Sequence, residues 1–289
     1  MTDYFCTLCP RGCNAARTES EGVGVCASGT LPRVARAAPH YWEEPCVSGK
    51  NGSGAVFFSG CALRCSYCQN GKISLGGHGK TVTVARLREI YFELIARGAH
   101  NINLVNPTHF AEAILQSLDA PLPVPVICNT GGYDKPETLR RFEGKIQIYI
   151  PDMKYALSAP AEKYSAAPDY PEIACAAILE MFRQTGRFAL DGDGLLRSGV
   201  IIRHLILPGH LENTFRVIDW VSGAFAPGDV LFSLMSQYTP RGEPSRAVSQ
   251  REYGAVMNYL GKSNIGDGFF QDMPDGEEAY IPDFDLTGV

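Results

Sequence analysis

Short apolar runs recur along the chain from residue 54 onward. Six of them have the length of a strand, at residues 55–58, 102–105, 124–127, 146–150, 200–207 and 230–235. Their apolar positions are mostly continuous rather than alternating, which is typical of strands buried on both faces. The pattern therefore predicts a sheet that is covered on both sides.

Segments with helical periodicity fill the intervals between these runs. Val84, Leu87, Tyr91 and Leu94 recur at helical spacing, and Gly98 can end that helix. We expect further helices over 110–118 and 171–183 and helices that begin near residues 212 and 250. Alternating strands and helices predict an α/β fold with parallel strands. Periodicity alone leaves open whether the sheet is doubly wound or a partial barrel.

The composition narrows the class of protein. The chain has 289 residues, of which 45% are hydrophobic and 20% charged, as in a folded globular protein. No apolar run reaches the roughly 18 residues of a membrane helix, and residues 1–6 lack the basic and apolar parts of a signal peptide. We expect no membrane association and a cytoplasmic protein. The net charge of -5 disfavours a nucleic-acid partner.

The most specific pattern is a group of three cysteines. Cys61, Cys65 and Cys68 are spaced C-x3-C-x2-C directly after the first predicted strand, where α/β folds place active sites. Three thiolates on one loop suit three irons of a [4Fe-4S] cluster and leave the fourth iron open to a small molecule. Zinc is the alternative, but a closed tetrahedral zinc site would need a fourth ligand from elsewhere.

A second group of cysteines precedes the first strand. Residues 1–50 are rich in Cys, Gly, Arg and Pro with little apolar periodicity, so we expect a small metal-binding module there and a main domain over 51–289. Four cysteines of this module, Cys6, Cys9, Cys13 and Cys26, fit zinc, iron or a second iron-sulfur cluster. A structural metal and an electron relay to the first cluster both remain open.

The loop from Cys61 to Cys68 resembles the defining motif of the radical S-adenosylmethionine (SAM) superfamily. Other stretches resemble the branch related to pyruvate formate-lyase activating enzyme, with a cysteine-rich N-terminus; they are residues 9–13, 42–46, 68–70, 101–109, 152–155, 203–205 and 235–240. The resemblance implies a TIM-like partial (β/α)6 barrel over 51–289, a [4Fe-4S] cluster, SAM, and a reductant such as flavodoxin or ferredoxin. It implies an oxidoreductase in which one electron cleaves SAM to methionine and a 5′-deoxyadenosyl radical, which abstracts hydrogen from a substrate.

The resemblance also implies roles for individual residues. Cys61, Cys65 and Cys68 would hold the cluster, and Tyr67 would lie against adenine. Asn106 and Thr108 would bind the amine of the methionine moiety, at the place where the family has a Gly-Gly-Glu motif. The alternative for Thr108 is the N-cap of the next helix. Near the methionine carboxylate and sulfonium the resemblance places Asn129, Thr130, Asp152, Lys154 and Arg203, and near the ribose Gln237. Asn129 replaces a family Asp, which leaves cation binding open, and a simple rim salt bridge is the alternative for Asp152 and Lys154.

Three functions remain open from the sequence. The resemblance favours an enzyme that acts on a glycyl residue of a partner enzyme. A different peptide or a small metabolite is the second possible substrate class. The third possibility is a metal-binding or redox scaffold without catalysis.

Overall fold

The computed structural model describes residues 4–272 and 281–289. Residues 1–3, on which the signal-peptide expectation partly rests, lie outside the described residues. Within the described part, no helix combines the length and the hydrophobicity that a bilayer crossing requires.

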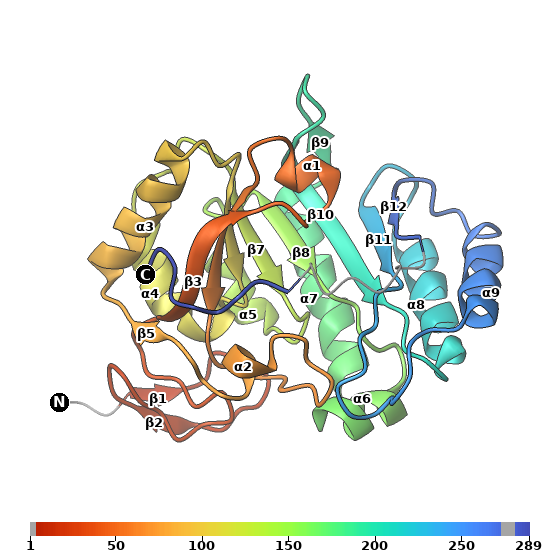
Figure 1. The fold of residues 1–289 in the computed structure, drawn as a ribbon, viewed down its shortest axis with the longest axis horizontal. Coiled ribbons are helices and arrows are strands. Elements are labelled where there is room, and N and C mark those ends of the chain that lie inside the picture. The colour runs from red at the N-terminus through yellow and green to blue at the C-terminus, as the bar shows by residue number, and fades with distance from the viewer. Residues whose placement is uncertain (1–3, 273–280) are drawn as a thin grey trace.

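A mostly parallel sheet organises the molecule (Figure 1). Its parallel strands follow the chain order, each beside the next; they are β4 (Ser53–Phe58), β6 (Ile102–Val105), β7 (Val126–Thr130), β8 (Ile148–Pro151), β10 (Leu196–Leu205), β11 (Leu231–Met235) and β12 (Gly268–Phe270). The six predicted strands are confirmed, and β12 is an addition. Because the strands are parallel, their carboxyl ends share one edge of the sheet.

Helices connect these strands. The five predicted helices are confirmed as α3 (Val84–Ala96), α4 (Ala111–Ser117), α7 (Tyr170–Thr185), α8 (Leu211–Ala224) and α9 (Gln250–Leu260). Shorter ones were not predicted: α1 (Pro45–Ser48), α2 (Gly71–Ser74), η1 (Thr108–Phe110), α5 (Pro136–Arg140) and α6 (Ser158–Ser165). Figure 1 shows α3 and α4 at the β3 end of the sheet and α8 and α9 at the β12 end.

The N-terminal 50 residues divide between two sheets. Strands β1 (Tyr4–Cys6) and β2 (Ala15–Arg17) form a separate antiparallel pair. In contrast, β3 (Arg33–His40) pairs antiparallel with β4 and with β5 (Lys80–Thr81), so it belongs to the main sheet. The small strand β9 (Ala189–Leu190) pairs antiparallel with β10. Val34 and Ala35 of β3 are fully buried. The division into a module over 1–50 and a domain over 51–289 stays a prediction.

His204 of β10 points away from the sheet edge that carries the predicted site. It is fully buried, with Nδ1 2.6 Å from the Met153 carbonyl oxygen and Nε2 2.9 Å from the Thr214 hydroxyl. Because the carbonyl only accepts, Nδ1 carries the hydrogen and the hydroxyl donates to Nε2. Burial lowers the pKa of His204 to about 4, against the opposing effect of the Met153 hydrogen bond. His204 is therefore a packed, neutral histidine of the core.

A pH-dependent loss of stability follows from this burial. The unfolded chain takes up the His204 proton near pH 6.5 and the folded chain only near pH 4, so stability falls as the pH drops through that interval. We expect His204 to contribute a loss of about 2 kcal/mol between pH 7 and pH 5. Urea unfolding of wild type and His204→Gln at both pH values measures it. Equal losses in the two proteins would contradict the assignment.

Candidate active site

A cavity of about 520 Å³ opens at the carboxyl edge of the sheet. It is bordered by the ends of strands β4, β6, β7, β8, β10, β11 and β12. Eleven of the twelve residues predicted for the site line it: Cys61, Cys65, Tyr67, Cys68, Asn106, Asn129, Thr130, Asp152, Lys154, Arg203 and Gln237. The structure thus brings together the cysteine loop after β4 and residues at the ends of β6, β7, β8, β10 and β11.

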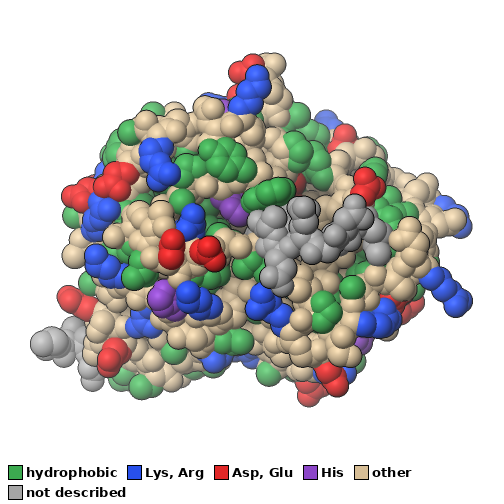
Figure 2. Space-filling view, viewed as in Figure 1, with side chains coloured by type: hydrophobic (Ala, Val, Ile, Leu, Met, Phe, Trp, Pro, Cys, Tyr) green, Lys and Arg blue, Asp and Glu red, His purple; other side chains and the backbone are tan. Residues whose placement is uncertain are grey.

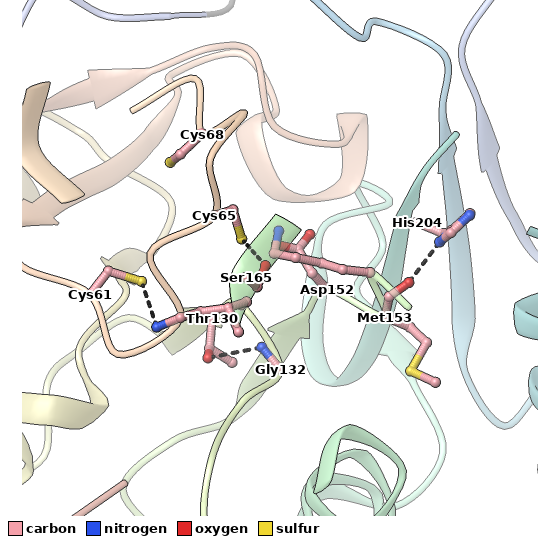
Figure 3. Close-up of polar contacts among 12 residues, drawn as sticks. Cys61, Cys65, Cys68, Thr130, Gly132, Asp152, Met153, Ser165 and His204 are labelled. Carbon is pink, nitrogen blue, oxygen red and sulfur yellow. Dashed lines mark hydrogen bonds and ion pairs between the residues drawn. The ribbon is translucent and has the colours of Figure 1, made fainter. Parts of the chain in front are cut away.

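The three cysteines project from one loop beside the strand ends that carry Thr130 and Asp152 (Figure 3). Each sulfur has a hydrogen-bonding neighbour: the Leu63 amide at 3.4 Å from Cys61, the Ser165 hydroxyl at 3.1 Å from Cys65, and the Ser74 hydroxyl at 3.2 Å from Cys68. Hydrogen bonds to cysteine sulfur tune the reduction potential of iron-sulfur clusters.

The thiols of this loop are suited to a polynuclear cluster. Burial raises the pKa of Cys65 to about 12, while Lys154 acts in the opposite direction. A metal would therefore have to displace the thiol proton, because cysteine binds metals as a thiolate. Within residues 4–272 and 281–289, no three His, Cys, Asp or Glu side chains are arranged to hold a single metal ion. The three sulfurs border one large cavity, so they could hold a [4Fe-4S] cluster whose fourth iron faces that cavity.

Asn106 fixes the start of the cysteine loop. It has a left-handed backbone (φ 59°), which Asn tolerates better than most residues. Its amide nitrogen donates to the Gly60 carbonyl oxygen at 2.8 Å, one residue before Cys61. Asn106 therefore both borders the cavity and positions the cysteine loop.

Thr108 is the predicted residue that the cavity does not include. Its side chain is buried and hydrogen-bonded to the carboxyl of Asp134, which also accepts from the Thr130 hydroxyl. Burial raises the pKa of Asp134, and these two hydroxyls partly offset that rise. Thr108 thus lies behind the cavity wall, where it shares a partner with Thr130 and does not face the cavity.

Asp152 and Lys154 form an ion pair at the end of β8. The Lys154 Nζ is 2.5 Å from Asp152 Oδ2, and the two side chains are 21% and 23% exposed. Burial alone would lower the pKa of Lys154, but Asp152, Cys65 and Tyr170 together outweigh it and hold that pKa well above its usual range. From α7, the Tyr170 hydroxyl donates to the Asp152 carbonyl oxygen and accepts from the Lys154 amide. This support fixes the pair at the cavity wall.

Tyr67 and Gln237 border the cavity on the side of the cysteine loop. Tyr67 is buried, with its ring 5.8 Å from the rings of both Tyr164 and Tyr238. Gln69 donates to the Gln237 carbonyl oxygen at 3.1 Å. The side-chain oxygen of Gln237 is buried without a hydrogen-bond partner in the described part of the chain. This oxygen is available to a ligand hydroxyl.

Arg203 is engaged by two carboxylates that the sequence analysis left without a role. Its Nε donates to Glu44 at 2.8 Å, and its Nη2 reaches both Glu44 and Glu43. Asn103 and Asn129 donate to the other oxygen of Glu43 at 2.8 and 3.5 Å. Both glutamates line the cavity. Their only signal in the sequence was the resemblance of residues 42–46, together with an asparagine inside an apolar strand.

The N-terminal cysteines pack directly behind the cysteine loop. Burial raises the pKa of Cys9 to about 11, and the neighbouring sulfurs of Cys26, Cys6 and Cys13 add to that rise. A Cβ at Gly60 would lie 2.6 Å from the Cys26 carbonyl oxygen. Arg11 donates to the Ala62 and Leu63 carbonyl oxygens of the loop. Arg11 and the Cys26 carbonyl thus place the N-terminal segment against the cysteine loop, and the metal there stays a prediction.

No family model matches the chain. The uncharacterized protein MJ0674 of Methanocaldococcus jannaschii is 25% identical over 227 residues, which cover 74% of this chain and 63% of that protein. A radical SAM methyltransferase from Sphaerobacter thermophilus superposes with a TM-score of 0.53 at 13% identity, covering 76% of this chain and 66% of that chain. The fold is similar to that of a radical SAM enzyme. SuiB of Streptococcus suis gives a TM-score of 0.49 at 12% identity over 73% of this chain and 46% of that chain.

This similarity concerns the arrangement of strands and helices. The chain spans less than two thirds of the length of MJ0674 and of the methyltransferase. The mixed α/β fold with a mostly parallel sheet therefore agrees with the sequence analysis. The branch related to pyruvate formate-lyase activating enzyme remains a matter of resemblance.

Proposed function

We propose that the chain is a radical SAM enzyme. The observation that carries the proposal is that Cys61, Cys65 and Cys68 border the same cavity as the Asp152–Lys154 pair. When bound, a [4Fe-4S] cluster with an open iron supplies the electron that cleaves SAM to methionine and a 5′-deoxyadenosyl radical, which takes hydrogen from a substrate.

The residues of the cavity have complementary tasks in this proposal. The three thiolates hold the cluster. Lys154 offers its ammonium to the methionine carboxylate, and Asp152 holds that ammonium in place. Tyr67 offers a buried aromatic face to the adenine, and Gln237 offers its free carbonyl oxygen to a ribose hydroxyl. The buried walls exclude water from the reacting atoms.

We also propose that the sheet curves into a partial barrel. Its parallel strands are neighbours in chain order from β4 to β12, and this order is that of a singly wound barrel rather than of a doubly wound sheet. A flavodoxin or ferredoxin would reduce the cluster. A glycyl residue of a partner enzyme remains one substrate in this proposal, with another peptide or a small metabolite as the alternatives.

The test is formation of 5′-deoxyadenosine. The full chain is reconstituted with iron and sulfide without oxygen, reduced with dithionite and given SAM. We expect 5′-deoxyadenosine and methionine in equal amounts, even without a substrate. An intact cluster that yields neither product would instead favour a metal-binding or redox scaffold.

A separate prediction concerns the N-terminal cysteines. Because Cys9 lies outside the cavity lining, we expect Cys9→Ala to lower the iron or zinc content of the reconstituted protein but to leave SAM cleavage by dithionite measurable. Metal analysis and product assay of the same sample measure both quantities. Loss of cleavage as complete as in a Cys65 variant would contradict the separate roles.

A further inference from the structure

Glu43, Glu44 and Arg203 form a buried acidic cluster in the cavity wall. Their side chains are 7%, 6% and 13% exposed. Arg203 forms a bidentate ion pair with Glu44, in which Nε donates to one carboxylate oxygen at 2.8 Å and Nη2 to the other at 2.5 Å. This geometry satisfies one carboxylate with one guanidinium. Glu43 is the second carboxylate beside the same guanidinium.

The acidic cluster carries one negative charge in excess. His40 also lines the cavity near Glu43, but burial lowers the pKa of His40 despite the attraction of Glu43, so its ring is neutral at pH 7. Asp152 and Lys154 compensate each other. Arg36, the next cation near His40, is paired with Asp285. The described lining therefore offers no second cation for Glu43, and a buried unbalanced charge is costly.

Beside Glu43, the side-chain oxygen of a buried asparagine accepts no hydrogen bond. Asn103 is fully buried, and its Nδ2 donates to Glu43 at 2.8 Å while its Oδ1 has no partner. Turning the amide over would place Oδ1 against the carboxylate, so this orientation is fixed. Asn103 lies on the same face of β6 as Val105, which lines the cavity. A buried acceptor without a donor is destabilising, and a hydrogen-bond donor placed between it and Glu43 would satisfy both.

Two residues that do line the cavity also carry acceptors without partners in the described part of the chain. The side-chain oxygens of Gln237 and Gln271 are buried without partners, and both residues line the cavity. Two aromatic residues of the lining, Trp42 and Phe270, are 51% and 60% exposed. Figure 2 shows hydrophobic side chains gathered on the upper part of the face that it draws. The site thus combines unmet acceptors with aromatic faces, which attract cations.

We propose that Glu43 and Asn103 bind a cationic nitrogen group of the substrate, either an ammonium or a guanidinium. This inference rests on the proposed function, because it assigns the substrate class of the same cavity. Glu43 supplies the charge and Asn103 Oδ1 supplies a second acceptor. The aromatic rim packs against the part of the substrate that joins the cation to the rest.

The experiment measures binding to the full reconstituted chain by ligand-observed NMR titration. The probes are methylguanidinium, methylammonium and the neutral N-methylurea. We expect at least one of the cations to bind at least tenfold more tightly than N-methylurea, and Glu43→Gln to remove that preference. Glu212→Gln changes an exposed glutamate of α8 as a control and should leave it intact. Equal binding of cations and urea by wild type, or an unchanged preference in Glu43→Gln, would overturn the proposal.

A second arm repeats the wild-type titration with saturating SAM. The proposal expects the cationic probe to bind alongside SAM. Loss of probe binding would overturn it, because Glu43 would then face the cation of SAM itself. Binding is measured without turnover, so a chain that binds the cation but forms no 5′-deoxyadenosine contradicts only the proposed function. If Glu43→Gln does not fold, the wild-type comparison of both cations with N-methylurea still decides.

Discussion

Cys65→Ala is expected to abolish 5′-deoxyadenosine formation, to below about 1% of wild type. Cys65 is the middle cysteine of the loop and is buried beside Ser165 and Lys154. Two remaining thiolates cannot replace a cluster held by three, and the reaction draws its electron from that cluster. We expect the reconstituted protein to lose about four irons per chain together with the absorbance of the first cluster.

The control for this prediction is a cysteine elsewhere. Cys175 lies on α7 and does not line the cavity. Cys175→Ala should keep the iron content and the product yield of wild type. The circular dichroism spectrum of Cys65→Ala should match that of wild type, because the change removes only one sulfur from a packed site. This measurement checks that the variant is folded. Retained cleavage in Cys65→Ala would contradict the assignment of the loop.

Arg203→Leu is expected to destabilise the chain by about 3–5 kcal/mol at pH 7. The change leaves Glu43 and Glu44 buried without their cation, which is the costly way to break a buried ion pair. Arg197→Leu is the matched control on the same strand, because Arg197 is 49% exposed and 3.8 Å from Asp191. Exposed pairs contribute about 0–1 kcal/mol. Urea unfolding of the three proteins measures the difference.

The pH dependence of this difference has a defined sign. Burial raises the pKa of Glu44, but attraction to Arg203 outweighs it and leaves that pKa below its usual range. The pair therefore stabilises wild type above the usual glutamate pKa and less as the pH falls. In Arg203→Leu the burial that raises the pKa of Glu44 is no longer opposed by Arg203, so Glu44 takes up a proton more readily on acidification. The difference in the free energy of unfolding between variant and wild type should become smaller from pH 7 to pH 5. A constant difference would contradict the account.

Sequence reasoning succeeded where the information is local. The cysteine loop needs eight consecutive residues, and the strand–helix alternation fixes where the carboxyl ends of the strands lie. Most of the residues predicted to bind the cofactor follow from that, because they come directly after or at the end of a predicted strand. The parallel order of the strands then places them around one cavity.

What sequence reasoning missed depends on contacts between distant segments. Arg203 and Glu44 are 159 residues apart, so no periodicity connects them. Thr108 and Thr130 both hydrogen-bond to the carboxyl of Asp134. This contact directs the Thr108 side chain away from the cavity. β3 escaped prediction because its residues, Arg-Val-Ala-Arg-Ala-Ala-Pro-His, have low strand propensity, and pairing with β4 overrides it.

The central claim is an iron cube with a corner that SAM can reach. Electron paramagnetic resonance of the reduced full chain, recorded before and after SAM is added, tests this claim most directly. We predict the signal of a reduced [4Fe-4S] cluster whose g values change with SAM in wild type and in Cys9→Ala, and which is absent from the first site in Cys65→Ala. A signal indifferent to SAM, or a loop that holds only zinc, would contradict the account.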